Sequence, residues 1–347
     1  MSFPKTVLRK AAATPPVLRL LGRFRPPGAT VFLSHRFKAT NAAPGGAFPA
    51  DALDALLGTL RRAGFTFAPL PELLEHVARD GRPVRDAVAF TVDDGYADFA
   101  EVALPVFEAF RCPATVFLST GPMDGTTWFW WDQVEYVLRR TEARAAEAAE
   151  GAWRVAAAWQ TPEERPAATA RLCEQLKAVP TPVMRALVRA LAAECGVALP
   201  EGPPAEYRMM TWDQVRDGAR RGATFGPHTV THPVLARCDD AQAADEVLRS
   251  TARLREEGVL TCPVFCFPNG EPGDFGAREI ALVEHAGLRA AVTTSPGYVD
   301  AARVSATGTA RFTLPRFHLP GGALDVLRIT SALDARLGRT GAVAHAG

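Results

Sequence analysis

Apolar residues along this chain follow two different spacings. Short apolar runs, typical of buried strands, occur at residues 30–34, 87–92, 114–118, 223–226, 264–267 and 290–294. Most of them are separated by stretches in which apolar residues recur every three or four positions, as at residues 51–63, 100–110 and 241–257. That second spacing predicts amphipathic helices. Strands that alternate with helices predict an α/β fold built on a parallel sheet.

The alternation is interrupted in the middle of the chain. The stretch from residue 124 to residue 207 is rich in Ala, Arg and Glu, has helical periodicity and carries few strand signals. It therefore predicts a helical insertion that divides the α/β domain into two pieces. The expected boundaries are an N-terminal extension at 1–28, the α/β domain at 29–123 and 208–320, the insertion at 124–207, and a C-terminal helix or tail at 321–347.

Two neighbouring carboxylates follow one of the predicted strands. Asp93 and Asp94 come directly after the run at 87–92, and Gly95 next to them allows the backbone to turn sharply. Such a turn lets both side chains approach one opening, so that one can bind a metal while the other stays free. A plain turn is the common alternative for this residue combination.

Two histidines follow another predicted strand. His228 and His232 lie four residues apart, a spacing that brings side chains to one side of a helical turn, whereas Pro227 and Pro233 favour a rigid loop. Either geometry permits chelation. Two imidazoles and one carboxylate form the ligand set of catalytic zinc sites, in which a fourth position stays open for an attacking water. Surface histidines are the ordinary alternative, but the joint occurrence with the carboxylates favours a metal site.

The two segments together resemble a known family. Residues 91–95 (TVDDG) and 228–233 (HTVTHP) resemble the first two motifs of the polysaccharide deacetylases, the NodB-like carbohydrate esterases. This resemblance implies a distorted, incomplete (β/α) barrel with its site at the C-terminal ends of the strands. It also implies that Asp93 is the catalytic base and that Asp94, His228 and His232 bind the metal.

Two further segments match the family less closely. Residues 31–36 resemble its opening strand, which makes His35 a candidate for substrate binding, and residues 266–270 resemble its third motif. The family commonly has an Arg at the start of that motif to orient the base, whereas this chain has Cys266, so another residue must hold Asp93. Asn269 falls where the family uses a backbone N–H to bind the oxyanion, a role that tolerates a change of side chain.

The last motif is the least clear. The family usually supplies a His there as general acid, and His318 is the candidate; a His that merely ends an edge strand is the alternative. The same segment also resembles the Pro-Arg ending of surface-polysaccharide relatives, which would place Arg316 near the substrate. No counterpart of the Asp that orients the acid is visible after residues 290–294.

Aromatic residues gather where the insertion begins. Rings commonly offer an apolar face to sugars, so Trp130 or Trp131 could line a glycan cleft. A small apolar core that anchors the insertion is the competing interpretation, and the sequence does not distinguish the two.

Composition is that of a globular enzyme with a sizeable core. The 347 residues are 48% hydrophobic, and the formal net charge of +1 offers no footprint for nucleic acid. Six cysteines without Cys-x-x-Cys spacing predict buried or free thiols. No apolar stretch has membrane-spanning length and the N-terminus lacks a signal-like apolar core, so we expect a cytoplasmic protein. The basic segment 17–25 could touch an anionic membrane weakly, although a solvated helix is the simpler interpretation.

These features predict metal-dependent removal of an acetyl group, in the first place an N-acetyl group on an amino sugar of a cell-surface glycan or its precursor. Zinc is the expected metal, and cobalt, nickel or iron would tolerate the same ligands. Two alternatives stay open: hydrolysis of a small non-sugar amide, and glycan binding without catalysis on a degenerate fold. The missing Arg of the third motif favours the noncatalytic alternative, while the four intact base and ligand positions oppose it.

Overall fold

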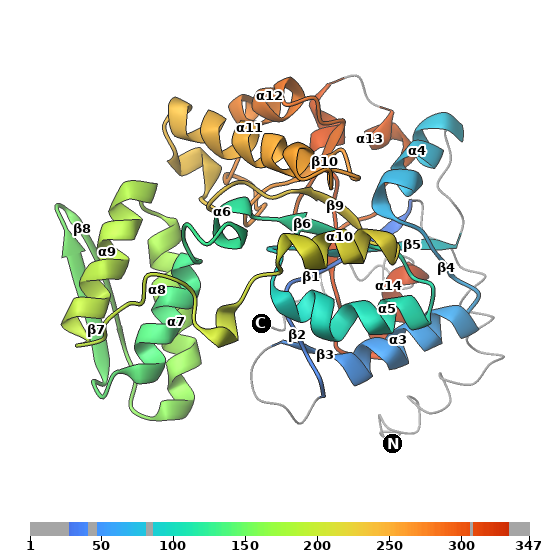
Figure 1. Cartoon of the computed structure of the whole chain (residues 1–347). Coiled ribbons are helices and arrows are strands. Elements are labelled where there is room, and N and C mark those ends of the chain that lie inside the picture. Colours follow the sequence, from blue (N-terminus) through green and yellow to red (C-terminus); the bar gives the residue numbers. More distant parts are fainter. Residues whose placement is uncertain (1–27, 41–46, 81–85, 306–307, 333–347) are drawn as a thin grey trace, which may run out of the picture.

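A parallel sheet forms the centre of the fold. The computed structural model describes residues 28–40, 47–80, 86–305 and 308–332 of the chain (Figure 1). Within these residues, six strands run in the order β12-β1-β5-β6-β9, with the short β4 paired to the start of β5. Their bounds are β1 Thr30–Ser34, β4 Thr66–Phe67, β5 Ala87–Val92, β6 Ala114–Leu118, β9 Thr224–Pro227 and β12 Phe317–His318. Every residue of β5 and β6 is buried, as expected for parallel strands covered on both faces.

Two more strands continue the sheet into an incomplete barrel. Strands β10 (Val264–Cys266) and β11 (Ala290–Val292) pair in parallel. On one side the carbonyl of Phe225 in β9 accepts a hydrogen bond of 2.8 Å from the N–H of Cys262, just before β10. On the other side a parallel bridge joins Val292 to Leu314, a few residues before β12. The ladder is broken at both places, so the expected distorted (β/α) barrel is confirmed.

Helices cover the outside of this barrel (Figure 1). They are α3 Ala50–Arg62, α4 Leu70–Asp80, α5 Leu104–Ala109, α10 Trp212–Arg220, α11 Asp240–Glu256, α12 Ala277–His285 and α14 Ala323–Thr330. Short elements add β2 Phe37–Lys38, β3 Phe48–Pro49, α6 Thr120–Met123 and α13 Ala301–Val304. The main core lies between α3, α5 and the sheet, where the rings of Phe90 and Phe107 pack 5.7 Å apart. The helix expected at 100–110 begins as a π-helical turn, Phe99–Ala103, before α5.

The insertion lies to one side of the barrel and has a core of its own (Figure 1). Its elements are α7 Trp130–Arg140, β7 Ala145–Glu150, β8 Trp153–Ala158, α8 Arg165–Lys177 and α9 Thr181–Glu194. The antiparallel pair β7 and β8 was not expected from the sequence. Ala and Glu have little strand preference, so the alternation of buried and exposed positions in β7 is stabilised by packing inside the insertion rather than by propensity.

Some expectations concern segments outside the described residues. The basic segment 17–25 and most of the C-terminal tail fall there. Among the helices of the described residues, none combines the length and the apolar character that crossing a bilayer requires.

Candidate active site

The residues of the first motif lie at the C-terminal end of β5. Asp94 and Gly95 adopt left-handed backbone conformations, with φ of 76° and 91°. A Cβ atom added at Gly95 would lie 2.9 Å from a side-chain carbon of Leu118, so both conformation and space favour glycine there. This turn directs the carboxylates of Asp93 and Asp94 into the same cavity, as the sequence predicted.

Left-handed backbone is concentrated at this end of the barrel. Seven non-glycine residues of the described chain have positive φ, and four of them lie here: Asp94, Thr229, His232 and Asn269. Thr229 is β-branched, which makes the conformation costly. Its hydroxyl compensates by accepting a hydrogen bond of 3.0 Å from the N–H of His232. The loop that carries the two histidines is therefore held in one specific shape.

Asp94, His228 and His232 form a cluster suited to a metal ion. Their ligand atoms all lie within 4.8 Å of one another, and the Nε2 atoms of both imidazoles are 3.5 Å from Oδ1 of Asp94. That buried oxygen has no hydrogen-bond partner among the described residues. Burial lowers the pKa of His232 to about 3, so its ring is neutral and can act as a ligand. One carboxylate and two imidazoles fit a divalent transition metal.

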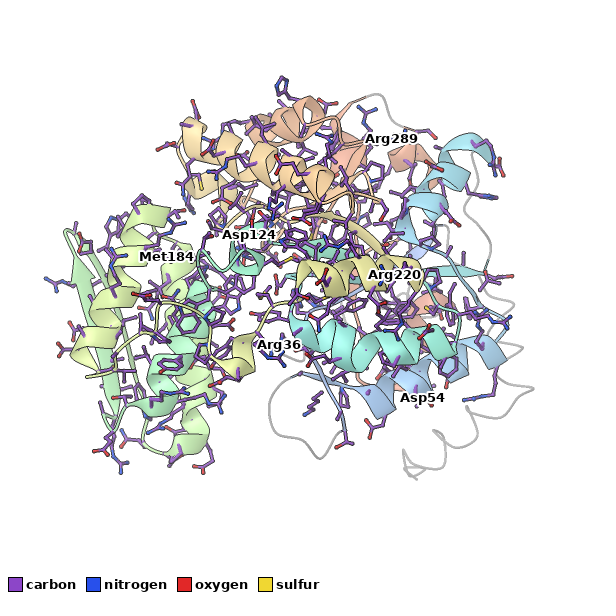
Figure 2. All side chains as sticks on the ribbon, in the orientation of Figure 1. Arg36, Asp54, Asp124, Met184, Arg220 and Arg289 are labelled. Carbon is purple, nitrogen blue, oxygen red and sulfur yellow. The ribbon has the colours of Figure 1, made fainter. Side chains whose placement is uncertain are left out.

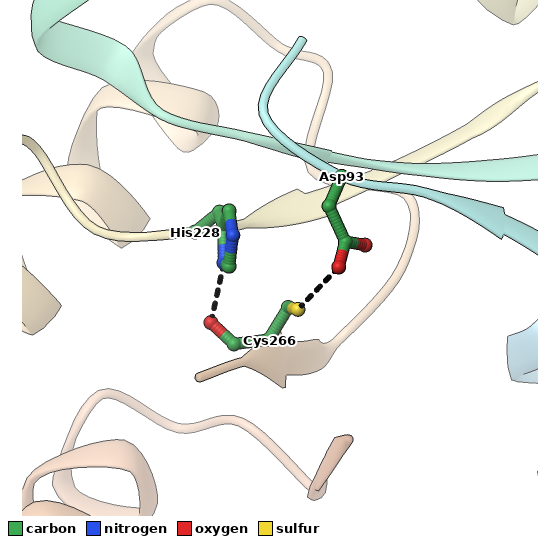
Figure 3. A group of neighbouring side chains, drawn as sticks. All are labelled: Asp93, His228 and Cys266. Carbon is green, nitrogen blue, oxygen red and sulfur yellow. Dashed lines mark hydrogen bonds between the residues drawn. The ribbon is translucent and has the colours of Figure 1, made fainter. Parts of the chain in front are cut away.

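The two imidazoles are oriented in different ways. Nδ1 of His228 donates to the carbonyl oxygen of Cys266 at 2.7 Å (Figure 3). This leaves Nε2 of His228 directed toward Asp94. His232 is held by aromatic walls instead. The ring of Trp131 packs edge-on against it at 4.6 Å between centroids, and the ring of Phe129 does so at 5.8 Å.

A buried carboxylate on α11 fixes the loop between the histidines. Oε2 of Glu246 accepts hydrogen bonds from the N–H groups of Val230 at 2.8 Å and Thr231 at 2.7 Å, and Oε1 accepts one from the Thr231 hydroxyl. Sequence reasoning missed this residue. The available signal was an acidic side chain on the apolar face of a predicted helix.

Arg316 holds the predicted base. Its guanidinium donates to both carboxylate oxygens of Asp93, at 2.7 and 2.8 Å, while being fully buried. It also donates to the carbonyl of Thr293, the hydroxyl of Thr91 and the sulfur of Cys266. The thiol of Cys266 in turn lies 3.5 Å from Asp93 (Figure 3). Arg316, in the last motif, thus orients the base. The family commonly has the orienting Arg in the third motif, at the position that Cys266 occupies in this chain.

This ion pair decides the charge of Asp93. Burial alone would raise the pKa of this carboxyl, but the ion pair and hydrogen bonds with Arg316 hold the pKa well below its usual range. Asp93 is therefore ionised at neutral pH. The sequence predicted Arg316 near the substrate, whereas the structure buries it behind the base, where its charge compensates that of the buried Asp93 carboxylate.

The carboxylates and imidazoles open into a cavity of about 370 Å³ between the barrel and the insertion. The barrel contributes His35 and Asn269, and the insertion contributes Trp130, Trp131 and Lys177. Arg36, which also lines the cavity, is labelled in Figure 2 on the side of the barrel that faces the insertion. The insertion therefore forms one wall of the site.

The two candidate tryptophans both pack against other aromatic rings and line the cavity, so the core and cleft interpretations are compatible. Trp130 is 8% exposed and belongs to the core of the insertion, yet it also lines the cavity. Trp131 stacks on Phe129 at 4.2 Å and donates its indole N–H to the hydroxyl of Tyr96 at 3.1 Å. Tyr96 in turn donates to Asp132 at 2.7 Å. Burial raises the pKa of Asp132 to about 8, and this carboxyl in the cavity wall was not foreseen.

Of the remaining candidates, His35 and Asn269 line the cavity and His318 does not. His318 is exposed, pairs with Leu33 in the sheet register, and is not among the residues that line the cavity. His35 does line it, with Nε2 4.0 Å from Oδ2 of Asp93. Asn269 also lines it, and its carbonyl accepts a hydrogen bond of 2.6 Å from the hydroxyl of Thr294.

Comparisons with known proteins agree with this fold. Residues 80–291 match the profile of the family described as polysaccharide deacetylase. The fold is similar to that of the Streptococcus pyogenes deacetylase PplD in complex with acetate (15% identity, 88% of this chain and 99% of that chain, TM-score 0.58). It is also similar to IcaB from Ammonifex degensii (15%, 89% and 97%, TM-score 0.55) and to a de-N-acetylase from Aggregatibacter actinomycetemcomitans (12%, 86% and 99%, TM-score 0.52). At such identities these structures support the fold alone. No curated protein sequence matches the chain.

Proposed function

The chain belongs to the polysaccharide deacetylase family, and we propose that it is a metal-dependent hydrolase that removes N-acetyl groups from amino sugars of a cell-surface glycan or its precursor. One observation carries the proposal. An ionised carboxylate, Asp93, shares a cavity with a second carboxylate, Asp94, whose unpartnered oxygen lies between two imidazoles. A base beside a three-ligand metal cluster is an arrangement suited to metal-assisted hydrolysis of an acyl group.

The metal would be held by Asp94, His228 and His232. When bound, such a cation polarises the acetyl carbonyl and lowers the pKa of water. Zinc suits the ligand set best, and cobalt, nickel or iron tolerate it.

The other groups of the cavity have complementary roles in the proposal. Asp93, kept ionised and aimed by Arg316, accepts the proton of the attacking water. The backbone N–H of Asn269 donates to the oxygen that becomes negative in the transition state. Trp131 offers an apolar wall against which a sugar ring can pack.

Hydrolysis of a small non-sugar amide is the second candidate activity. The cavity of about 370 Å³ is large enough for a sugar unit, and its aromatic wall favours a glycan. Glycan binding without catalysis is less well supported, because the base and all three ligand positions are intact and brought together.

Removal of the metal tests this function. Purified protein should release acetate from N-acetylglucosamine oligomers, lose that activity on treatment with a chelator, and regain it when zinc is added. Acetate release is followed by an enzyme-coupled assay, and simple acetamides serve as the comparison. Activity on the acetamides alone would support the small-amide alternative, and glycan binding without acetate release would support the noncatalytic one.

We further propose that His35, rather than His318, gives the proton to the leaving amine, because His35 lines the cavity near Asp93 and His318 does not. Replacing His35 with Gln should then lower turnover on an N-acetyl amide roughly 10²-fold, but much less on an activated aryl acetate, whose leaving group needs no proton. The matched variant His318→Gln should change neither rate. An amide-selective loss in His318→Gln instead would return the role to the residue suggested by the sequence.

A further inference from the structure

A second cavity lies on the other side of the histidine loop. It has a volume of about 380 Å³ and is lined by residues of the insertion and by Thr231 and Pro233 of the loop. His232, between those two, lines the catalytic cavity instead. Trp130 lines both cavities. The two cavities are therefore neighbours that share a wall.

The charge of this second cavity differs from that of the catalytic one. Arg185 and Arg189 lie one turn apart on α9 and both line it, and none of its lining residues is an Asp or Glu. The catalytic cavity, by contrast, is lined by four carboxyl groups: Asp93, Asp94, Asp132 and Glu135. Two guanidinium groups without a carboxylate make the second cavity suited to an anion.

Neither of the two arginines forms a direct ion pair with a carboxylate of the described residues, unlike other surface arginines. Arg220, for example, pairs with Asp217 at 3.0 Å on α10. Arg189 has no ion-pair partner among the described residues. Arg185 donates to the hydroxyl of Thr231 at 2.9 Å, and that hydroxyl donates in turn to the buried carboxylate of Glu246. An incoming oxyanion would therefore meet donors that are not already occupied by a carboxylate.

The rest of the lining mixes apolar and polar side chains. Trp128, Trp130, Val188 and Leu199 are apolar, and Thr126, Thr127, Gln133 and Thr181 are polar. Apolar faces with a few polar groups suit a sugar ring, and arginines suit its negative substituent. A free inorganic anion would use the arginines but not the apolar lining.

We propose that this cavity is a second glycan subsite that binds a negatively charged sugar unit, carrying a carboxylate or a phosphate, next to the unit that is deacetylated. The proposal rests on the proposed function, and it narrows the substrate class to an acidic glycan or a phosphorylated precursor. Arg185 and Arg189 would bind the oxyanion, while Trp130 would lie between the two units.

Binding measurements test the subsite without relying on turnover. Isothermal titration calorimetry in the Asp93→Asn background would use three probes: an N-acetylglucosamine–glucuronic acid disaccharide, N-acetylglucosamine phosphate and neutral diacetylchitobiose. The double change Arg185→Gln with Arg189→Gln should weaken one or both acidic probes about tenfold or more, since a charge-assisted hydrogen bond is lost at each position. Affinity for the neutral probe should not change. The acidic probe with the larger loss identifies carboxylate or phosphate as the natural group.

The matched control is Arg220→Gln, a change of the same kind on an exposed arginine of α10 away from both cavities (Figure 2). It should leave all three affinities unchanged, and circular dichroism of each variant verifies folding.

Equal affinities of the parent protein for acidic and neutral probes, or equal losses on all probes in the double variant, would overturn the subsite. If acetate is released from neutral oligomers but an acidic group on the probe does not change its affinity, the subsite fails and the proposed function stands. If the arginines bind the acidic probes but no substrate is deacetylated, the subsite stands and the proposed function fails.

Discussion

Replacing Asp93 with Asn should reduce acetate release by roughly 10²- to 10⁴-fold, the usual contribution of a general base. The amide cannot accept the proton of the attacking water, yet its oxygen can still accept a hydrogen bond from Arg316. Because Asp93 is not part of the cluster formed by Asp94, His228 and His232, the variant should keep its metal. Turnover and elemental analysis of the same preparation measure both quantities.

The neighbouring change Asp94→Asn is the matched control. It removes the carboxylate whose buried oxygen lies 3.5 Å from both imidazoles, so it should lower metal content and activity together. Equal loss of metal in the two variants would show that the carboxylates share one role rather than dividing base and ligand between them.

Replacing Arg316 with Met should lower the free energy of unfolding by about 3–5 kcal/mol, because removing one partner of a buried ion pair leaves an uncompensated charge. The remaining partner is Asp93, which is 2% exposed and receives two hydrogen bonds from Arg316. Activity should fall as well, since the base loses the groups that orient it. Urea unfolding monitored by circular dichroism measures the change in stability.

Two comparisons make this result specific to the ion pair. The double change Arg316→Met with Asp93→Asn removes both charges, so it should recover part of the stability but none of the activity.

The folded pKa of Asp93 is depressed below its unfolded value. The stability that the pair contributes is therefore fully present above the ordinary Asp pKa of about 3.9 and is lost as the pH falls from there toward the folded pKa. The deficit of Arg316→Met should shrink correspondingly in acid. A deficit below about 1 kcal/mol at neutral pH would contradict the expectation, because exposed pairs contribute that little.

Local signals in the sequence were sufficient for the strand and helix alternation and for the position of the two motifs. Asp93 and Asp94 follow an apolar run that a glycine turn ends, and His228 follows another such run. Parallel strands bring their C-terminal ends to one edge, so motifs that each follow a strand converge once the sheet forms. The convergence of these residues could therefore be anticipated from the sequence.

Other features depended on contacts between residues far apart in the chain. Arg316 and Asp93 are 223 positions apart, and only the barrel brings them together. The same is true of Cys266, whose small side chain lies beside the base and contacts the guanidinium of Arg316, just before β12. Glu246 fixes the histidine loop from a helix whose pattern indicated only an apolar face.

The sequence by itself determined the fold class and the pairs of carboxylates and imidazoles, because periodicity, turn glycines and motif spacing are local properties of the chain. The tertiary structure alone decided three things: that Arg316 is buried behind Asp93, that His35 rather than His318 faces the base, and that the insertion contains the hairpin of β7 and β8. Each of these depends on whether a side chain finds a partner or a packing surface in a distant segment. Burial and charge compensation are determined by such partners, and the residue's own neighbours in sequence do not record them.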